Sequence, residues 1–302
     1  MFYSDFEFNL HDALLTAGVE RRFGRSELFQ AGDEQACFEA LAPSAQTGWD
    51  LAVDYYSKIV SPHEFNDRQQ FLPRLNLAGI GEPDDRESQF LDIAAGFRVA
   101  AALAYRNCRW EAQDAANRRW IADVSALLDK HEPTIAPRLA SLYHEPWPEQ
   151  PIEVDVVQTV SWAGANSFFA RGHAGHLMIS SASQGHEAIE TVFHEASHGF
   201  MIDDDALQQA LRDAAAQLEV EVPRGLWHVV LFVTTGETVR QALVAAGEPD
   251  YEPMIVEIYG RSSWGQYKDA MNAVWPSYLD GTLGAEEAMI ALINETRQGA
   301  SQ

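Results

Sequence analysis

The stretch His194-Glu195-Ala196-Ser197-His198 lies within the run 186–200 and carries the strongest functional signal in the sequence. In an α-helix, residues four apart lie one turn above each other, so the imidazoles of His194 and His198 point to one spot and Glu195 lies beside it. Two neutral imidazoles supply half of a tetrahedral zinc shell, and a third protein ligand and a water molecule complete it. The spacing therefore predicts a zinc site in which Glu195 takes a proton from that water.

The residues around this motif favour a helix in the core. Apolar side chains recur at helical spacing, at Ala188, Ile189, Val192, Phe193 and Ala196. Gly199 follows the second histidine, at a place where a helix can end. The alternative is a buried helix whose histidines only form hydrogen bonds to their neighbours. We favour the metal site, because two histidines and a glutamate are costly to bury without a metal that uses them.

The segment 191–199 resembles the active-site helix of the zincin metallopeptidases. In the metzincin branch of these enzymes a glycine and a third histidine follow shortly after the motif, whereas here Gly199 is followed by Phe-Met-Ile-Asp-Asp-Asp. The resemblance therefore implies the gluzincin branch, in which the third zinc ligand is a glutamate on a later helix.

A second informative stretch, 225–243, is mostly apolar and is predicted to be a buried helix, yet it carries His228, Glu237 and Arg240. A buried carboxylate needs a cation or several hydrogen-bond donors, and zinc is one such cation. We expect Glu237 to be the third metal ligand, with Gly236 beside it allowing a close approach to the histidine-bearing helix. Arg240, three residues further on, is the other partner that this glutamate could have.

His228 is the rival third ligand. It precedes Glu237 by nine residues, which on a straight helix places the two about half a turn out of phase and about 13 Å apart along the axis. One helix therefore cannot bring both side chains to one ion. Glu237 is favoured because the third-histidine pattern of metzincins is absent. Otherwise His228 could donate a hydrogen bond to a developing oxyanion, or it could be a core histidine.

Tyr259 is a further catalytic candidate, within the predicted helical tail 251–293. In several gluzincins a tyrosine or histidine from the C-terminal part donates a hydrogen bond to the oxyanion of the tetrahedral intermediate, and the resemblance suggests this role for Tyr259. The alternative is an aromatic residue that only fills the core, as Trp264 and Trp275 could also do.

The expected fold class is α+β and mainly α. Residues 1–148 have helical patterns, and prolines from 133 onward, ending in Pro146-Trp-Pro-Glu-Gln-Pro151, break them. After this boundary, 152–162 and 176–181 have the patterns of short strands. We predict a mainly helical N-terminal region (1–148) and a zincin-like catalytic region (149–302), with a small mixed sheet, the active-site helix and C-terminal helices. The two regions could form one continuous domain.

The strand before the active-site helix is the edge of the sheet in zincins, and it lines the substrate cleft. A peptide can add its backbone to such an edge. The residues at this place are predicted to bind substrate, and they are Leu177, Met178, Ile179 and Ser180.

The composition is that of a globular protein with an acidic surface. Lys and Arg number 21 against 45 Asp and Glu, which gives a net charge of −24 at pH 7, and 46% of the residues are apolar. This charge repels nucleic acid and anionic membranes and at most favours basic peptides, and a well-solvated surface is the favoured explanation of it. We therefore expect a peptide or protein as partner, and neither nucleic acid nor a membrane. The oligomeric state is left open.

Two cysteines, Cys37 and Cys108, are far apart and lack metal-ligand spacing. They do not make a disulfide framework, so reducing surroundings are expected. The first residues lack a basic segment followed by an apolar one, and no run of about 18 apolar residues occurs. We therefore expect a cytoplasmic protein. A secreted or periplasmic protein whose leader has been removed would look the same.

A wider resemblance, covering nearly the whole chain, is to a group of uncharacterised bacterial proteins regarded as zinc peptidases. It is carried by Asn9-Leu-His11, Asn117-Arg-Arg-Trp120, Trp162-Ala-Gly-Ala165, the motif 194–198, and Leu226-Trp-His-Val-Val-Leu-Phe with Thr235-Gly-Glu237. That group brings no established substrate.

Taken together, these patterns predict a hydrolase that cleaves peptide bonds and holds one Zn²⁺ per chain. Glu195 would act first as general base toward water and then as general acid toward the leaving amine. In one alternative, the protein binds zinc and a peptide without cutting. In another, the motif is accidental and the chain is a helical scaffold.

Overall fold

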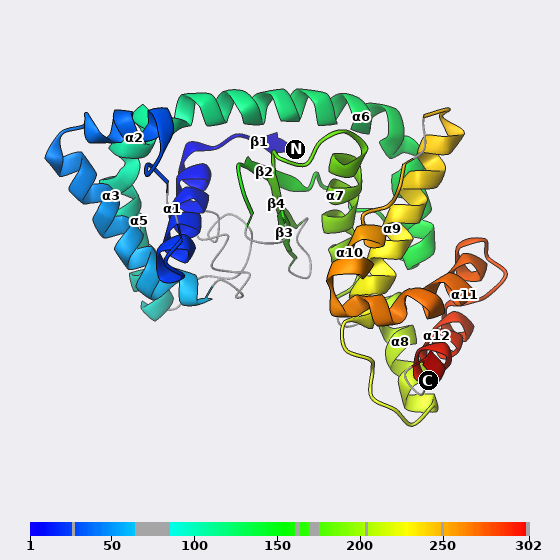
Figure 1. The fold of residues 1–302 in the computed structure, drawn as a ribbon. Helices are drawn as coiled ribbons and strands as arrows, with labels where there is room; N and C mark the ends of the chain where they lie inside the picture. The colour runs from blue at the N-terminus through cyan, green and yellow to red at the C-terminus, as the bar shows by residue number, and fades with distance from the viewer. Residues whose placement is uncertain are drawn as a thin grey trace. The chain divides into compact units, whose positions relative to one another are not determined.

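The computed structural model describes residues 1–25, 28–63, 85–160, 164–169, 175–202, 205–248 and 251–299. Within these ranges the chain is mainly helical and contains one small mixed sheet, which confirms the predicted fold class (Figure 1). Two compact units are present. Met1–Asp123 and Gln150–Gln184 form the first, and Val124–Glu149 and Gly185–Gln302 form the second.

The sheet belongs to the first unit and has the strand order β1-β2-β4-β3. Its strands are β1 (Phe2–Tyr3), β2 (Glu153–Val157), β3 (Ala165–Phe168) and β4 (His176–Ser180). The first three strands in this order are parallel, and β3 is antiparallel to β4. Strand β4 is buried along its whole length, as expected for a strand with neighbours on both sides.

The interior place of β4 contradicts its predicted role as a sheet edge. Leu177 pairs with Val154 of β2 on one side and with Ser167 of β3 on the other. Both backbone edges of β4 are therefore occupied, and a peptide cannot add to the segment Leu177–Ser180 by strand pairing. The sequence prediction failed here because no strand was expected at Ala165–Phe168, where β3 forms.

Helices of the first unit cover the sheet and pack on each other. They are α1 (Phe6–Arg22), α2 (Gly32–Glu39), α3 (Pro43–Tyr55), α5 (Asp85–Tyr105), the short turns η1 (Tyr56–Val60), η2 (Ser61–His63) and η4 (Arg106–Trp110), and the first part of α6 (Glu111–Tyr143). Asp5 starts α1, since its carboxylate accepts a hydrogen bond of 2.8 Å from the Phe8 N–H. Helix α3 approaches α5 closely because Gly48 has no side chain to meet the Ala100 carbonyl.

A buried amide network joins α1, α6 and β2. Asn117 on α6 donates to the Val156 carbonyl oxygen (2.8 Å) and to the Asn9 side-chain oxygen (3.0 Å). Asn9 in turn donates to the same Val156 carbonyl at 3.0 Å. Neither asparagine is more than 1% exposed, so these bonds satisfy groups that have no access to water.

The two cysteines form a disulfide, which corrects the expectation from their spacing. Cys37 on α2 and Cys108 on η4 are 71 residues apart in the chain, and their Cα atoms lie 5.6 Å apart. Tertiary packing of α2 against η4 creates this proximity, which sequence spacing alone does not reveal. Disulfides are typical of oxidising compartments, whereas the sequence led us to expect a reducing one.

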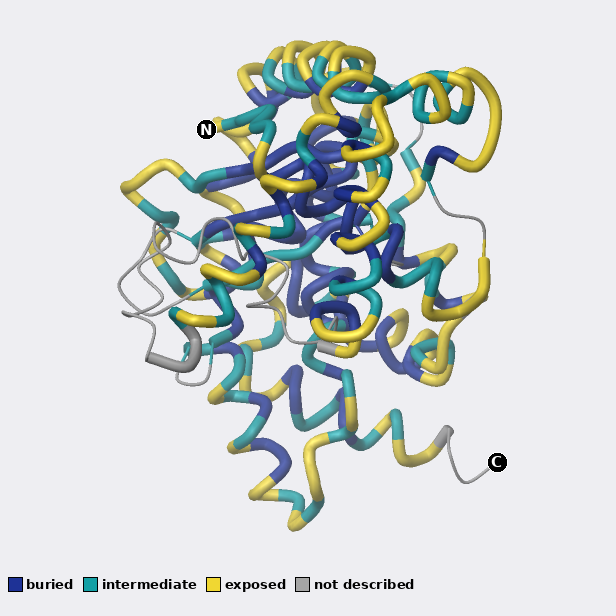
Figure 2. The backbone as a smooth tube through the Cα atoms, turned by 90° about the vertical axis from the view of Figure 1, so that its left-hand side faces the viewer, coloured by how far each residue is buried: buried dark blue, intermediate teal, exposed yellow. Residues whose placement is uncertain are grey.

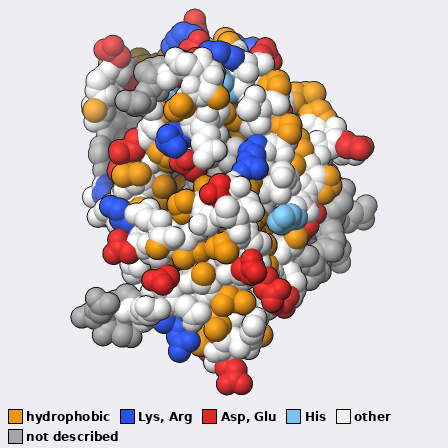
Figure 3. Space-filling view, turned by 90° about the vertical axis from the view of Figure 1, so that its right-hand side faces the viewer, with side chains coloured by type: hydrophobic (Ala, Val, Ile, Leu, Met, Phe, Trp, Pro, Cys, Tyr) orange, Lys and Arg blue, Asp and Glu red, His pale blue; other side chains and the backbone are white. Residues whose placement is uncertain are grey.

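The second unit is helical throughout the described residues. It contains the rest of α6, then α7 (Gly185–Ser197), η5 (His198–Phe200), α8 (Ala206–Gln217), α9 (Leu226–Ala245), α10 (Ile255–Arg261), η6 (Ser263–Tyr267), α11 (Lys268–Leu279) and α12 (Ala285–Gly299). Along the helices of the chain, buried residues alternate with exposed ones (Figure 2). Figure 3 shows acidic side chains scattered over one face, with hydrophobic side chains between them.

Helix α6 continues past the prolines that were expected to end it. Pro133 and Pro137 lie inside the helix, and the pattern stops only at Tyr143, before His144 adopts a φ of 57°. Both prolines are on the exposed side of α6, where water can bond the carbonyl groups that the missing N–H groups leave free.

The predicted division at residue 148 does not coincide with the two compact units. Helix α6 contributes to both units, and the strands that follow residue 148 belong with the N-terminal helices. No helix in the described part of the chain is both long and apolar enough to cross a membrane. Of the motifs quoted above, Trp162 and Ala163 lie outside the described residues.

Candidate metal centre

Helix α7 presents the motif as its spacing predicts. The apolar residues Ala188, Ile189 and Phe193 are buried, and His194 lies in the last turn. The α-helix ends at Ser197, and His198 starts the single turn η5. The rings of His194 and His198 still approach each other, with centroids 5.1 Å apart.

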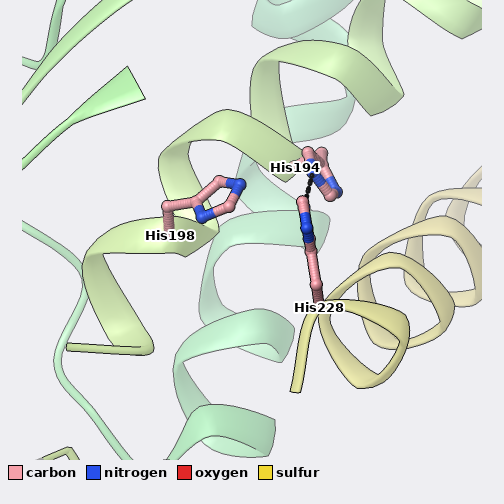
Figure 4. Close-up of side chains that lie close together, drawn as sticks. All are labelled: His194, His198 and His228. Carbon is pink, nitrogen blue, oxygen red and sulfur yellow. Dashed lines mark hydrogen bonds between the residues drawn. The ribbon is translucent and has the colours of Figure 1, made fainter. Parts of the chain in front are cut away.

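Helix α9 brings a third histidine to the same place. His228 lies in the first turn of α9, and its Nε2 is 3.2 Å from the Nε2 of His194 (Figure 4). The ring of His228 lies 4.9 Å from that of His198. One nitrogen from each of the three imidazoles can be chosen so that all lie within 4.8 Å of one another. These three histidines are therefore close enough to hold a metal ion.

Burial keeps the three imidazoles in the neutral form that a metal requires. Loss of hydration lowers the pKa of His198 to about 4 and, with a contribution from His198, lowers that of His228 to about 3. Burial also lowers the pKa of His194 well below its ordinary value, and the other two histidines add to this shift. The Nδ1 atom of His194 is buried without a hydrogen-bond partner among the described residues. Neutral, desolvated imidazoles are suitable metal donors.

Glu195 lies beside this cluster, as predicted. It is 7% exposed, and its Oε2 atom is 4.0 Å from the Nε2 of His198. The adjacent position in the sequence turns its side chain about 100° around the helix from that of His194. A carboxylate at this place can accept a proton from a group held at the histidines without being a ligand itself.

Glu237, the expected third ligand, is not in the cluster that the described residues form, and His228 is. Its carboxylate accepts two hydrogen bonds from Arg240, at 2.6 and 2.7 Å, and one from Gln241 at 2.9 Å. Burial opposes ionisation of Glu237, but these donors and the arginine charge hold its pKa below the ordinary value. Helix α9 is continuous over both residues, so turning His228 toward α7 turns Glu237 away from it.

Gly236 does allow the close approach between helices that its sequence position indicated. A Cβ atom at this residue would lie 2.8 Å from the Glu190 Oε1 atom on α7 and 2.8 Å from the Pro253 side chain. The group that needs this space is therefore Glu190 and not a metal ligand at position 237.

Glu190 is a buried carboxylate that the sequence reasoning missed. It accepts hydrogen bonds from the Tyr251 hydroxyl and the Met254 N–H, and burial raises its pKa to about 7. Its position four residues before His194, on the same side of an apolar helix, was a signal for a special environment. The contacts hold the segment before α10 against α7.

Aromatic rings surround the three histidines. Trp227 stacks on His228 with centroids 4.7 Å apart, and Trp264 meets the same ring edge-on at 4.8 Å. Phe232 stacks on both His194 (3.7 Å) and His228 (5.0 Å). From the sequence, Trp264 was expected only to pack in the core or a cleft. Trp227 precedes His228 directly and Phe232 follows it by one helical turn, so their places in the sequence could have indicated contact with this histidine.

Tyr259 lies on α10 and is 9% exposed. Its hydroxyl group is buried with no hydrogen-bond partner among the described residues, and burial raises its pKa. No described contact joins Tyr259 to the three histidines. Its part in oxyanion stabilisation therefore stays a prediction, while His228, the other candidate for that part, lies in the cluster of three histidines.

Comparison of the chain with family models, curated proteins and solved structures finds no match. The third residue beside His194 and His198 is His228, at the place where the sequence led us to expect a glutamate. What the site can do therefore follows from its own donors: three neutral imidazoles from two helices, one adjacent carboxylate and an aromatic surround.

Proposed function

We propose that this chain is a zinc-dependent hydrolase that cleaves peptide bonds, with one zinc ion per chain bound by His194, His198 and His228. The observation that carries the proposal is the convergence of these imidazoles within 4.8 Å, with the Glu195 carboxylate 4.0 Å from one of them. Three protein ligands leave a fourth position for water, which is the donor set of catalytic zinc sites.

The donor spacing supports this metal. Two nitrogens bound tetrahedrally at 2.0–2.1 Å from zinc lie about 3.3 Å apart. The corresponding distance between the Nε2 atoms of His194 and His228 is 3.2 Å. Because all three donors are neutral, they leave the charge of a divalent ion undiminished, which favours its action as a Lewis acid.

The reaction assigns separate tasks to the cation and to the protein. Bound zinc supplies polarisation of the scissile carbonyl group and lowers the pKa of water toward neutrality. Glu195 accepts one proton from the attacking water while the oxygen–carbon bond forms. It then donates that proton to the amine nitrogen as the carbon–nitrogen bond breaks, so the carboxylate is regenerated.

The ligand assignment is tested by measuring the zinc content of the purified protein by mass spectrometry. The wild type and Glu237→Ala are expected to carry one zinc per chain, and His194→Ala and His228→Ala are expected to lose it. Glu237→Ala is the matched control because it removes a partly buried polar side chain from the same helix as His228. Zinc loss in Glu237→Ala with retention in His228→Ala would overturn the assignment.

The role of Glu195 is tested by Glu195→Gln, which keeps the shape of the side chain and removes the base. Zinc content should be unchanged, while the rate of peptide cleavage should fall by about 10²–10⁴-fold. A wild-type protein that binds zinc and peptides but cleaves none of a broad peptide library would support the alternative of a non-catalytic zinc- and peptide-binding protein.

A further inference from the structure

Two tryptophans, Trp227 and Trp264, form a wall of rings beside the histidines. Trp227 and Trp264 are half-buried, whereas Phe232 beneath them is only 9% exposed. Trp227 also meets His198 edge-on at 5.7 Å, so the two indole rings together border His198 and His228. The described residues offer neither indole N–H a hydrogen-bond partner. Each of these rings keeps part of its surface exposed.

The backbone around Gly225 is shaped to hold Trp264 in this wall. Gly225 has a φ of 77°, in the region that favours glycine, and it precedes α9. A Cβ atom there would lie 2.9 Å from the Trp264 Nε1 atom. The Ser262 side chain accepts a hydrogen bond of 3.2 Å from the Trp264 N–H and so fixes the turn that carries this ring. The placement of Trp264 beside His228 thus has its own structural support.

The charges around the site decide which side chain such a wall accepts. Every ring that contacts His228 is uncharged, and the Glu195 carboxylate lies beside the cluster, 4.0 Å from the Nε2 of His198. A divalent ion on three neutral imidazoles leaves a net positive site even with Glu195 ionised, so a Lys or Arg side chain next to it is repelled. An acidic side chain would compete for the metal as an oxygen ligand.

We propose that Trp227 and Trp264 form a substrate subsite that takes a large apolar side chain, aromatic or branched aliphatic, next to the scissile bond. This inference rests on the proposed hydrolase function and specifies its substrate class. Burial of such a side chain against two indole rings removes apolar surface from water on both partners, and ring stacking adds to this for a phenylalanine.

The test uses a set of otherwise identical alanine-rich peptides in which one central residue is Phe, Leu, Ala, Lys or Glu. Cleavage by the zinc-loaded wild type is followed by mass spectrometry, which also locates the cut. Binding to zinc-loaded Glu195→Gln is measured by calorimetry, independently of turnover. The Phe and Leu peptides should exceed the Ala peptide by about tenfold or more in both measurements, and the Lys and Glu peptides should not exceed it.

Variants of Trp264 connect this preference to the wall. Trp264→Ala should reduce the advantage of Phe over Ala to about threefold or less, while Trp264→Phe, which keeps a ring, should retain most of it. Both variants should hold one zinc per chain, which shows that His228 is still in place.

The outcomes separate the two proposals. A preference in binding without any cleavage would support the subsite and overturn the hydrolase. Cleavage that is indifferent to the side chain, or a preference for Lys or Glu, would overturn the subsite and leave the hydrolase standing. Absence of preference in both measurements also overturns the subsite, whatever Trp264→Ala does to the fold.

Discussion

Zinc binding by this protein should be nearly independent of pH between 7 and 5, because burial keeps the imidazoles neutral. For three exposed histidines with a pKa of about 6.5, only about one thirtieth of each is neutral at pH 5, so proton competition lowers the affinity by about 3 × 10⁴-fold. Here the pKa is about 4 for His198 and about 3 for His228, and that of His194 is well below its ordinary value. Protonation of the metal-free site then lowers the affinity for zinc by about twofold or less at pH 5.

The assay is a competition titration of the metal-free protein against a chelating indicator of known pH dependence, at pH 7, 6 and 5. A short peptide with three exposed histidines is the control and should show the large loss. Affinity should fall steeply only below about pH 4, where His198 begins to accept a proton. A loss of 10³-fold or more by pH 5 in folded protein would refute the reasoning, because it would mean that the histidines are hydrated or displaced from the core.

The same shifts bear on stability, so the fold has to be followed during this titration. The unfolded chain protonates its histidines below about pH 6.5, whereas folded His198 and His228 stay neutral to about pH 4 and 3. Each therefore lowers the stability of the metal-free protein by about 2 kcal/mol between pH 7 and 5. Glu190 acts in the opposite sense. Its folded pKa of about 7 gives stability at low pH that is lost as the pH rises from 4.5 to 7.

Three further predictions concern the scaffold. Cys37→Ser, and equally Cys108→Ser, should lower the free energy of unfolding by roughly 4 kcal/mol in urea titrations, since the bond closes a loop of 71 residues; equal stability with and without reductant would contradict this. Gly236→Ala should cost about 1–3 kcal/mol because of the 2.8 Å contacts with Glu190 and Pro253. Gly260→Ala is the control, because Gly260 is also helical but has open space around it, and this substitution should leave stability unchanged or raise it. Equal changes in stability at the two positions would argue against the close approach of α9 to α7. Asn117→Ala should cost about 1–3 kcal/mol, because it leaves the Val156 carbonyl and the Asn9 amide with fewer partners; a thermal melt unchanged from wild type would show that the amide network is dispensable.

The part of the site that the sequence predicted is the part that depends on local geometry. His194, Glu195 and His198 lie within one turn, so the helical repeat alone determines how they share a face. The apolar residues around them correctly indicated a buried helix, and the fold class followed from the helical patterns of the flanking segments.

The third donor could not be determined in the same way, because both candidates lie on one helix. Choosing between His228 and Glu237 requires the rotation of α9 about its axis, and packing against α7 fixes that rotation. Gly236 was correctly associated with a close approach to α7, but the side chain that fills the space is Glu190. Arg240 supplied a local partner that makes a metal unnecessary for Glu237.

The failed predictions in the first unit have a related cause. Whether β4 is an edge strand depends on β3, which is only four residues long and was not expected from the sequence pattern. Whether Cys37 meets Cys108 depends on how α2 packs against η4. The disulfide joins segments 71 residues apart in the chain, and β3 is only four residues long, so periodicity carries little information about either.

The passage of α6 through both compact units has a consequence for how this chain can be divided. A fragment beginning at residue 149 would lack Tyr143, whose hydroxyl donates to the Leu231 carbonyl on α9, and Lys130, which pairs with Glu248. A fragment ending at 148 would lack three of the four strands. Neither the N-terminal nor the C-terminal half of the chain contains a whole unit. A single recombination point therefore cannot replace one unit by that of another protein. No single cut of the chain can therefore separate the two units.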